Sequence, residues 1–181
     1  MEELKFLGIS GSLRRASRNT GLLRCCAEHL PEGVRMEIAD VSMLPFYNED
    51  LEKPASVLDF LAKVRECDAL VMACPEYNHA LAPALKSALD WASRERPQPL
   101  AGKTGCVLGA AGGMGSVRSQ NHLRQVCRCL DMHLLNFPEL FTNAFSPDFD
   151  DQGSVVGAKL ENKVVGLMQA LADWTVKMAR S

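Results

Sequence analysis

Two uninterrupted apolar runs constrain the fold of this chain more than any other feature. Residues 68–74 read DALVMAC and residues 104–111 read TGCVLGAA, without alternation between apolar and polar positions. A strand of this kind is covered on both faces, which is typical of a parallel sheet with a layer of helices on each side. Further strands are predicted at about 4–10, 34–39 and 133–137.

The segments between these strands have helical periodicity. Apolar residues recur at three- and four-residue steps at about 19–30, 55–66, 82–95, 116–131 and 157–179. Five strands alternating with helices predict an α/β fold with a doubly wound, five-stranded parallel sheet and helices on both faces. We predict loops at 41–54 and 138–156, and a single domain over residues 1–181, since no repeat or linker divides the chain.

Composition argues against several classes of protein. The 181 residues are 47% hydrophobic with a formal net charge of −2, so there is no basic field for nucleic acid or an anionic membrane. The first ten residues, MEELKFLGIS, contain no long apolar segment, so we expect neither a signal peptide nor a membrane span. Seven cysteines, two of them (Cys74 and Cys106) in predicted strands, favour buried free thiols in a reducing cytoplasm. The four histidines lack the spacing of zinc ligands, so no metal site is expected.

A loop rich in hydrogen-bond donors, SGSLRRASRNT at residues 10–20, joins the first strand to the first helix. In doubly wound sheets ligands bind at the carboxyl ends of the strands, and the free N–H groups of a helix N-terminus attract phosphate. Several side chains there add donors for an anion: Ser12, Arg14, Ser17, Asn19 and Thr20. The alternative is that Ser17 or Asn19 is only an N-cap and that the arginines lie in a solvated turn. The combination predicts a phosphate-binding loop.

Two further loops are predicted at the same edge of the sheet. Residues 75–79, PEYNH, offer an aromatic surface and amide donors, or alternatively form only a capped turn before the next helix. Residues 112–116, GGMGS, allow a backbone to approach a flat ligand closely, although alone they indicate only a flexible turn. Neither a Walker phosphate loop nor the Gly-x-Gly-x-x-Gly dinucleotide pattern is present.

The sequence resembles the NADPH-dependent FMN reductase family, and within it the bacterial quinone and chromate reductases. The resemblance depends on four stretches in order: GSLRRASRN, PEYN, LKSALDWASR and GSVRSQNHLRQV. It implies a flavodoxin-like three-layer sandwich with strand order 2-1-3-4-5, an FMN cofactor and NAD(P)H as co-substrate. Electrons would pass to small-molecule acceptors: quinones, free flavin, azo compounds or metal oxyanions. The flavin carries the hydride in such enzymes, so no side chain is expected to act as a nucleophile.

Carried over by position, the resemblance implies three groups of FMN contacts. The phosphate would be held by Ser12, Arg14, Ser17, Asn19 and Thr20. The ribityl chain and isoalloxazine ring would be lined by Pro75, Glu76, Tyr77 and Asn78, and the pyrimidine end by Gly112 and Gly113. The chain departs from the family pattern at Ala110, where relatives tend to have serine or threonine, and at Gly115-Ser116, where they often have two glycines.

Two other functions are weighed against this enzyme. A flavodoxin-type electron carrier would have no nicotinamide activity, but flavodoxins tend to be acidic and to lack arginine in the phosphate loop. This chain is nearly neutral and has three arginines there, which favours the enzyme. A redox sensor would use four clustered thiols, although their helical spacing favours core packing: Cys25, Cys26, Cys127 and Cys129.

The family also forms dimers or tetramers, and this chain has apolar residues that exceed the needs of one sheet face. They lie around Leu81, Leu85, Trp91 and residues 44–47, and together they predict a homodimer or homotetramer. The segment LPFYNEDL at 44–51 is predicted either to reach the pocket mouth or a partner subunit, or to be held by Phe46 in the core.

Overall fold

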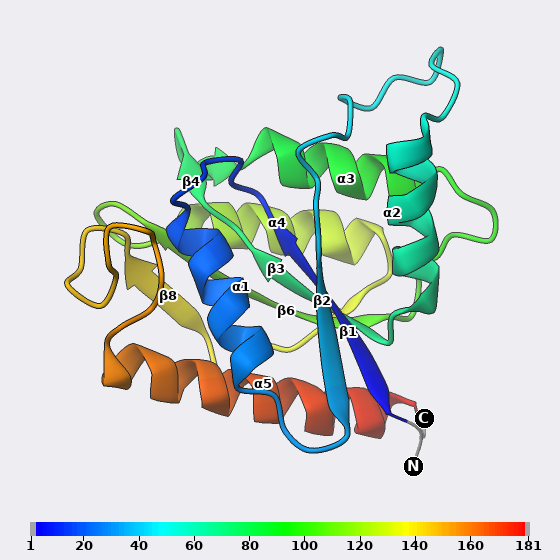
Figure 1. Ribbon diagram of the computed structural model, residues 1–181. Helices are drawn as coiled ribbons and strands as arrows, with labels where there is room; N and C mark the ends of the chain where they lie inside the picture. The colour runs from blue at the N-terminus through cyan, green and yellow to red at the C-terminus, as the bar shows by residue number, and fades with distance from the viewer. Residues whose placement is uncertain (1–2, 180–181) are drawn as a thin grey trace.

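A parallel sheet forms the centre of the computed structural model, which describes residues 3–179 (Figure 1). Its strands are β1 (Leu4–Ser10), β2 (Val34–Ala39), β3 (Ala69–Ala73), β6 (Thr104–Ala111), β7 (His133–Leu134) and β8 (Leu140–Asn143). The order is β2-β1-β3-β6, and β7 and β8 both pair with the outer edge of β6. With β7 and β8 sharing the fifth position, the order 2-1-3-4-5 is confirmed.

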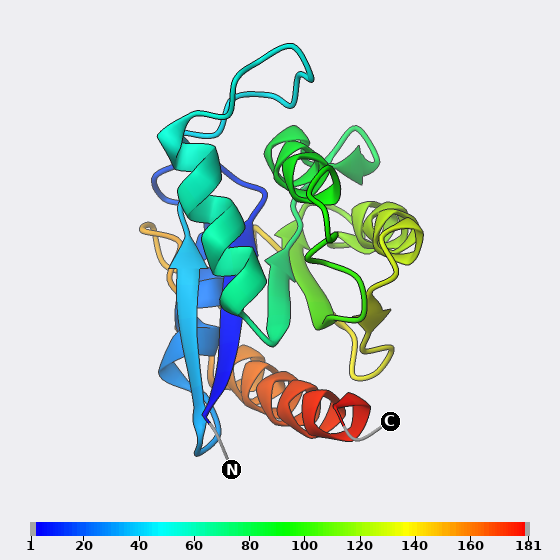
Figure 2. The same cartoon turned by 90° about the vertical axis from the view of Figure 1, so that its right-hand side faces the viewer.

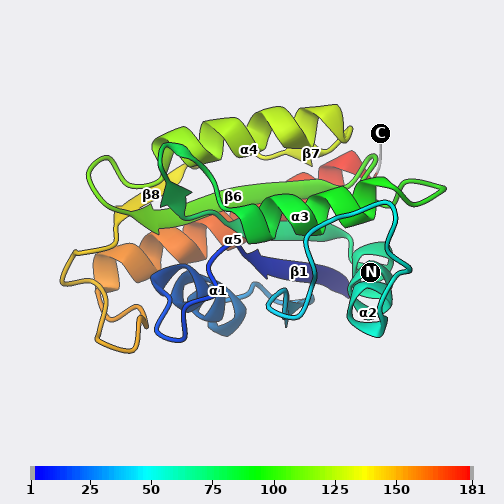
Figure 3. The same ribbon diagram turned by 90° about the horizontal axis from the view of Figure 1, so that it is seen from above.

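Helices cover both faces of this sheet (Figures 2 and 3). One face packs against α2 (Ala55–Glu66), α3 (Pro83–Ser93) and α4 (Val117–Cys129), and the other against α1 (Arg18–Glu28) and α5 (Ala158–Met178). Successive residues of β3 alternate between the two cores, and all five are buried. The predicted three-layer arrangement is confirmed, because strands covered on both sides bury every residue. None of the helices within residues 3–179 is long and apolar enough to cross a bilayer.

The prediction for the fifth strand is wrong in detail. A continuous strand was expected at 133–137, but β7 ends at Leu134, and pairing with β6 resumes only in β8, inside the predicted loop 138–156. Proline lacks the N–H that a strand ladder requires, and Pro138 follows directly after the expected strand. The interruption therefore has a local cause, and β8 pairs with the carboxyl half of β6, from Leu108 to Ala111.

A small hairpin after β3 was not predicted. It consists of β4 (Glu76–Tyr77) and β5 (Ala80–Leu81), which pair with each other as a separate two-stranded sheet and contact α4. Asn78 and His79 form its two-residue turn with φ angles of 50° and 66°. Positive φ at both central residues is the geometry of a type I′ turn, and asparagine tolerates it better than most non-glycine residues.

Side chains of α3 hold the loop 41–54, which stands out at the top of Figures 1 and 2. The Trp91 indole N–H donates to the Pro45 carbonyl (2.9 Å), and Ser87 Oγ accepts the Tyr47 backbone N–H (2.8 Å). The rings of Tyr47 and Trp91 meet edge to face, with centroids 5.1 Å apart. Phe46 is 73% exposed, so the alternative in which Phe46 holds the loop in the core is wrong. Tyr47 has that role.

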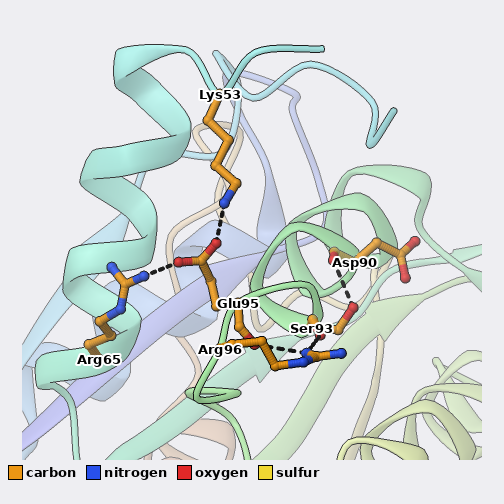
Figure 4. Close-up of polar contacts among 6 residues, drawn as sticks. All are labelled: Lys53, Arg65, Asp90, Ser93, Glu95 and Arg96. Atoms are coloured by element: carbon orange, nitrogen blue, oxygen red, sulfur yellow. Dashed lines mark hydrogen bonds and ion pairs between the residues drawn. The ribbon is translucent and has the colours of Figure 1, made fainter. Parts of the chain in front are cut away.

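Glu95, which follows α3, also secures the loop (Figure 4). Its carboxylate accepts hydrogen bonds from Lys53 at the end of the loop and from Arg65 in α2. Ser93 and Arg96 close the turn around it by donating to backbone carbonyls, at 2.7 Å and 2.9–3.3 Å. The loop is therefore attached to α2 and α3, while Phe46 stays at the surface.

Candidate functional site

The three predicted loops meet at one end of the sheet, on the left in Figure 1. The first two loops and the end of β6 line a cavity of about 130 Å³ there. Seven predicted site residues line it: Ser12, Arg14, Ser17, Asn19, Pro75, Glu76 and Tyr77. Thr20, Asn78, Gly112 and Gly113 are not among the lining residues. Four residues that were not predicted as site residues do line the cavity: Arg18, Ala110, Ala111 and Ala144.

The N-terminus of α1 forms one wall of this cavity. Ser17 is its N-cap, and Ser17 Oγ accepts the backbone N–H of Thr20 at 3.2 Å. The N–H groups of the first helical residues, Arg18 and Asn19, are donors that a helix leaves without an internal partner. The first turn contains no acidic residue, so its partial positive charge is available to an anion.

Asn19 and Thr20 use their side chains for other purposes than predicted. Asn19 is 5% exposed, and its amide donates to the Ala110 carbonyl (2.9 Å) and accepts the Ala110 N–H (3.0 Å). The Thr20 hydroxyl donates to Ser10 Oγ at 2.9 Å. Asn19 thus ties the start of α1 to the end of β6. Both side chains have partners within the protein, and the Thr20 N–H is donated to Ser17 Oγ, so of these two residues Asn19 alone has a backbone N–H left for an anion.

Two arginines supply positive charge to the cavity. Arg14 is exposed at its edge, and Arg18 lies partly buried in its wall. The Nε of Arg18 is buried without a hydrogen-bond partner, and among residues 3–179 no carboxylate pairs with either guanidinium. An unpaired buried donor is costly, so an anionic ligand would relieve it. The sequence signal for Arg18 was its place directly after the N-cap.

The second loop contributes Glu76 and Tyr77. Glu76 Oε2 accepts the backbone N–H groups of Arg118 (3.0 Å) and Ser119 (3.2 Å) at the start of α4. Its side chain is 9% exposed, and Oε1 lies 3.4 Å from Arg118 Nη1. Tyr77 is 45% exposed at the rim. The alternative of a capped turn before the next helix is wrong, because the N-cap of α3 is Ala82 and no side chain caps that helix; Glu76 caps α4 instead.

The third loop follows β6 and is open to solvent. Gly112 and Gly113 are exposed, and Gly113 has a φ angle of 59°, which residues with a side chain rarely adopt. Phe145, 79% exposed, lies so close that a Cβ on Gly112 would be 3.3 Å from its ring. A flat ligand above the cavity would meet this backbone edge.

An apolar hollow of about 420 Å³ adjoins the cavity and shares Arg14 and Tyr77 with it. Its other walls include Leu13 and Phe46, which are 58% and 73% exposed. Phe46 lines this hollow, so the loop 41–54 reaches the mouth of the site. This is the first of the two alternatives predicted for residues 44–51.

The cysteines do not resemble a redox sensor. Burial raises the pKa of Cys25 to about 11 and that of Cys127 to about 12, and it raises the pKa of Cys26 well above its ordinary value. Cys129 alone of the seven is exposed. Reactive sensors require accessible thiolates, so this hypothesis loses support.

Comparison with known proteins agrees with this geometry: the chain belongs to the NADPH-dependent FMN reductase family, whose sequence model matches residues 4–146. It is 42% identical over 181 residues to an NAD(P)H-dependent FMN reductase of Pseudomonas aeruginosa, covering 98% of each chain. A probable NADPH:quinone oxidoreductase of Oryza sativa is 40% identical, covering 98% of this chain and 94% of the relative. The protein is therefore an NAD(P)H-dependent oxidoreductase with FMN as cofactor.

Solved structures show the same architecture. FerB, a flavoenzyme NAD(P)H:(acceptor) oxidoreductase from Paracoccus denitrificans, is 27% identical with a TM-score of 0.87, covering 97% of this chain and 98% of its own. A WrbA-like flavodoxin from Agrobacterium tumefaciens, 11% identical, aligns with a TM-score of 0.65 over 98% and 99% of the two chains. The flavodoxin-like fold is confirmed, and the alternative of an electron carrier without nicotinamide activity receives no support.

Proposed function

We propose that this cavity binds one FMN per chain and that the enzyme passes electrons from NAD(P)H to quinones. The observation that supports this most directly is the wall around the α1 N-terminus, with two unpaired arginines, free helix N–H groups and no carboxylate in the first turn. Such a site fits the phosphate of FMN.

Each predicted residue has a part in this proposal. The FMN phosphate is held by the side chains of Ser12, Arg14 and Ser17 and by the backbone N–H of Asn19, and we add Arg18 to this group. Thr20 acts through Ser17, because its N–H holds Ser17 Oγ in place. The ribityl chain and ring are lined by Pro75, Glu76, Tyr77 and Asn78, with Gly112 and Gly113 at the pyrimidine end. Bound FMN supplies the hydride chemistry, so the protein binds and orients the reactants.

The apolar hollow suggests what the acceptor is. Leu13, Phe46 and Tyr77 offer exposed apolar surface beside a single charged residue, Arg14, which suits a planar, largely apolar ring. Relatives from Oryza sativa, Solanum tuberosum and Escherichia coli have the names of quinone oxidoreductases or quinone reductases. Free flavins, azo compounds and metal oxyanions are further acceptor classes that the family resemblance suggests.

Steady-state kinetics test the proposal. One site for donor and acceptor requires that oxidised nicotinamide leaves before the quinone enters. We therefore expect parallel double-reciprocal lines when NADPH is varied at several quinone concentrations. Intersecting lines would contradict a shared site. A titration with FMN and riboflavin tests the phosphate contacts separately, because equal affinity for the two would refute them.

We also propose that the protein acts as a single-domain homodimer or homotetramer in the cytoplasm. Exposed apolar residues line the hollow beside the site, among them Leu13 and Phe46 at 58% and 73% exposure. Leu81, Leu85 and Trp91 are buried within the chain and do not contribute to such a surface. The free cysteines agree with a reducing compartment. Light scattering that gives the mass of one chain, 19.8 kDa, at micromolar concentration would contradict the assembly.

A further inference from the structure

Helix α4 begins without a cap of its own. The side chain of its N-cap, Ser116, accepts no backbone N–H of the first turn, and that turn contains no acidic residue. The first N–H groups of any helix need an external partner when they are not exposed to water. Ser119 is completely buried, so its N–H in particular requires one within the protein.

Glu76 supplies that partner from a distant part of the chain. Its carboxylate accepts the N–H groups of Arg118 and Ser119 at 3.0 and 3.2 Å, across 42 and 43 residues of sequence. A carboxylate at a helix N-terminus is favoured by the helix dipole, and the limited exposure of this side chain strengthens the interaction. Glu76, in the second loop, thus caps α4, the helix that follows the third loop.

Glu76 belongs to the proposed FMN site, and its partners in α4 lie just after the third loop of that site. Glu76 opens the hairpin that presents Tyr77, and α4 follows directly after the glycine-rich loop 112–115. The hairpin turn is held with positive φ at Asn78 and His79, a conformation that persists only where the surroundings impose it. The Glu76 contact fixes one strand of that hairpin to α4.

We propose that Glu76 is a positioning residue. Its hydrogen bonds to the N–H groups of Arg118 and Ser119, which we call the clasp, attach the second loop to the third and so set the spacing between the two sides of the flavin-ring site. The inference rests on the proposed function, and it changes the role that the family resemblance implied for this side chain. A carboxylate already engaged by two backbone N–H groups acts on the ring site through α4, in addition to lining the cavity.

Amide hydrogen exchange in the FMN-free protein tests the clasp directly. Glu76→Ala is expected to speed exchange in the first turn of α4 about tenfold, the usual effect of losing a cap, and to weaken FMN binding by a similar factor. Glu76→Gln keeps an amide oxygen that accepts both N–H groups, so it should restore most of the protection and affinity. Asp90→Ala, which removes the half-buried carboxylate of an i,i+4 pair on α3, is the matched control and should change neither.

A third variant separates the backbone contact from the ion pair. Arg118→Ala keeps the N–H and removes only the guanidinium, which is 45% exposed, so protection and affinity should stay within about threefold of the parent protein. The clasp is refuted if Glu76→Ala weakens FMN binding without faster exchange, or if Glu76→Gln behaves like Glu76→Ala. A parent protein that binds no FMN would contradict the proposed function instead, while the exchange result would still decide whether Glu76 holds α4.

Discussion

Replacing Asn19 with alanine is predicted to destabilise the protein strongly, because its amide satisfies two buried backbone groups. The amide donates to the Ala110 carbonyl at 2.9 Å and accepts the Ala110 N–H at 3.0 Å. Asn19 and Ala110 are 5% and 2% exposed, so water does not readily replace the lost partner. A buried polar group without a partner costs about 1–3 kcal/mol, which gives about 2–6 kcal/mol for the two groups of Ala110.

Urea unfolding of the FMN-free protein measures this loss, with far-UV circular dichroism as the signal. Asn121→Ala is the matched control: Asn121 is exposed on α4, and its replacement should change stability by no more than about 0.5 kcal/mol. Asn19→Asp keeps the acceptor for the Ala110 N–H but loses the donor, so it should remain destabilised. A loss below about 1 kcal/mol in Asn19→Ala would refute the reasoning, because it would mean that the pair is not needed to satisfy Ala110.

Three further predictions concern charge, close packing and thiols. Arg14→Ala should weaken FMN binding by about 1–3 kcal/mol in a fluorescence titration. Arg14→Lys should also weaken it, because an ammonium cannot make a bidentate contact with phosphate. Unchanged affinity in both variants would exclude Arg14 from the site. Gly21→Ala should lower the thermal midpoint by several degrees, because the new Cβ would lie 1.7 Å from the Gly153 carbonyl; an unchanged midpoint would contradict that packing. Ellman's reagent at pH 8 should titrate Cys129 rapidly and the other six thiols only after unfolding, and rapid reaction of more than one thiol would be evidence against their burial. Burial raises the pKa of Cys25 from 9.0 to about 11, so this thiol stabilises the fold below about pH 9, and the contribution is lost as the pH rises towards 11.

The parallel sheet with helices on both faces was predictable from the sequence, but the short strands β4, β5 and β8 were not. Strands β3 and β6 are apolar at nearly every position, and this pattern has few explanations other than burial on both faces. The hairpin of β4 and β5 has two residues in each strand, too few for any periodicity. Strand β8 lies beyond Pro138, where the sequence pattern indicates a break and cannot show that pairing with β6 resumes.

The sequence predicts the anion-binding side chains of the candidate site, but not the hydrogen bonds that hold the site together. Ser12, Arg14 and Ser17 are residue types that bind anions, and their place between a strand and a helix identified them. The partners of Asn19 and Glu76 are backbone groups, 91 and 42 residues away in the chain. Backbone atoms leave no mark in a sequence, so their pairing with a particular side chain becomes visible only in the fold.

The most direct test of the account is anaerobic mixing of the FMN-loaded protein with NADPH and with NADH in a stopped-flow spectrometer. If the protein is an NAD(P)H-dependent FMN oxidoreductase, at least one nicotinamide should bleach the flavin absorbance within seconds, and a quinone added afterwards should restore it. A flavin that dithionite reduces readily but that neither nicotinamide reduces would contradict the account and favour an electron carrier.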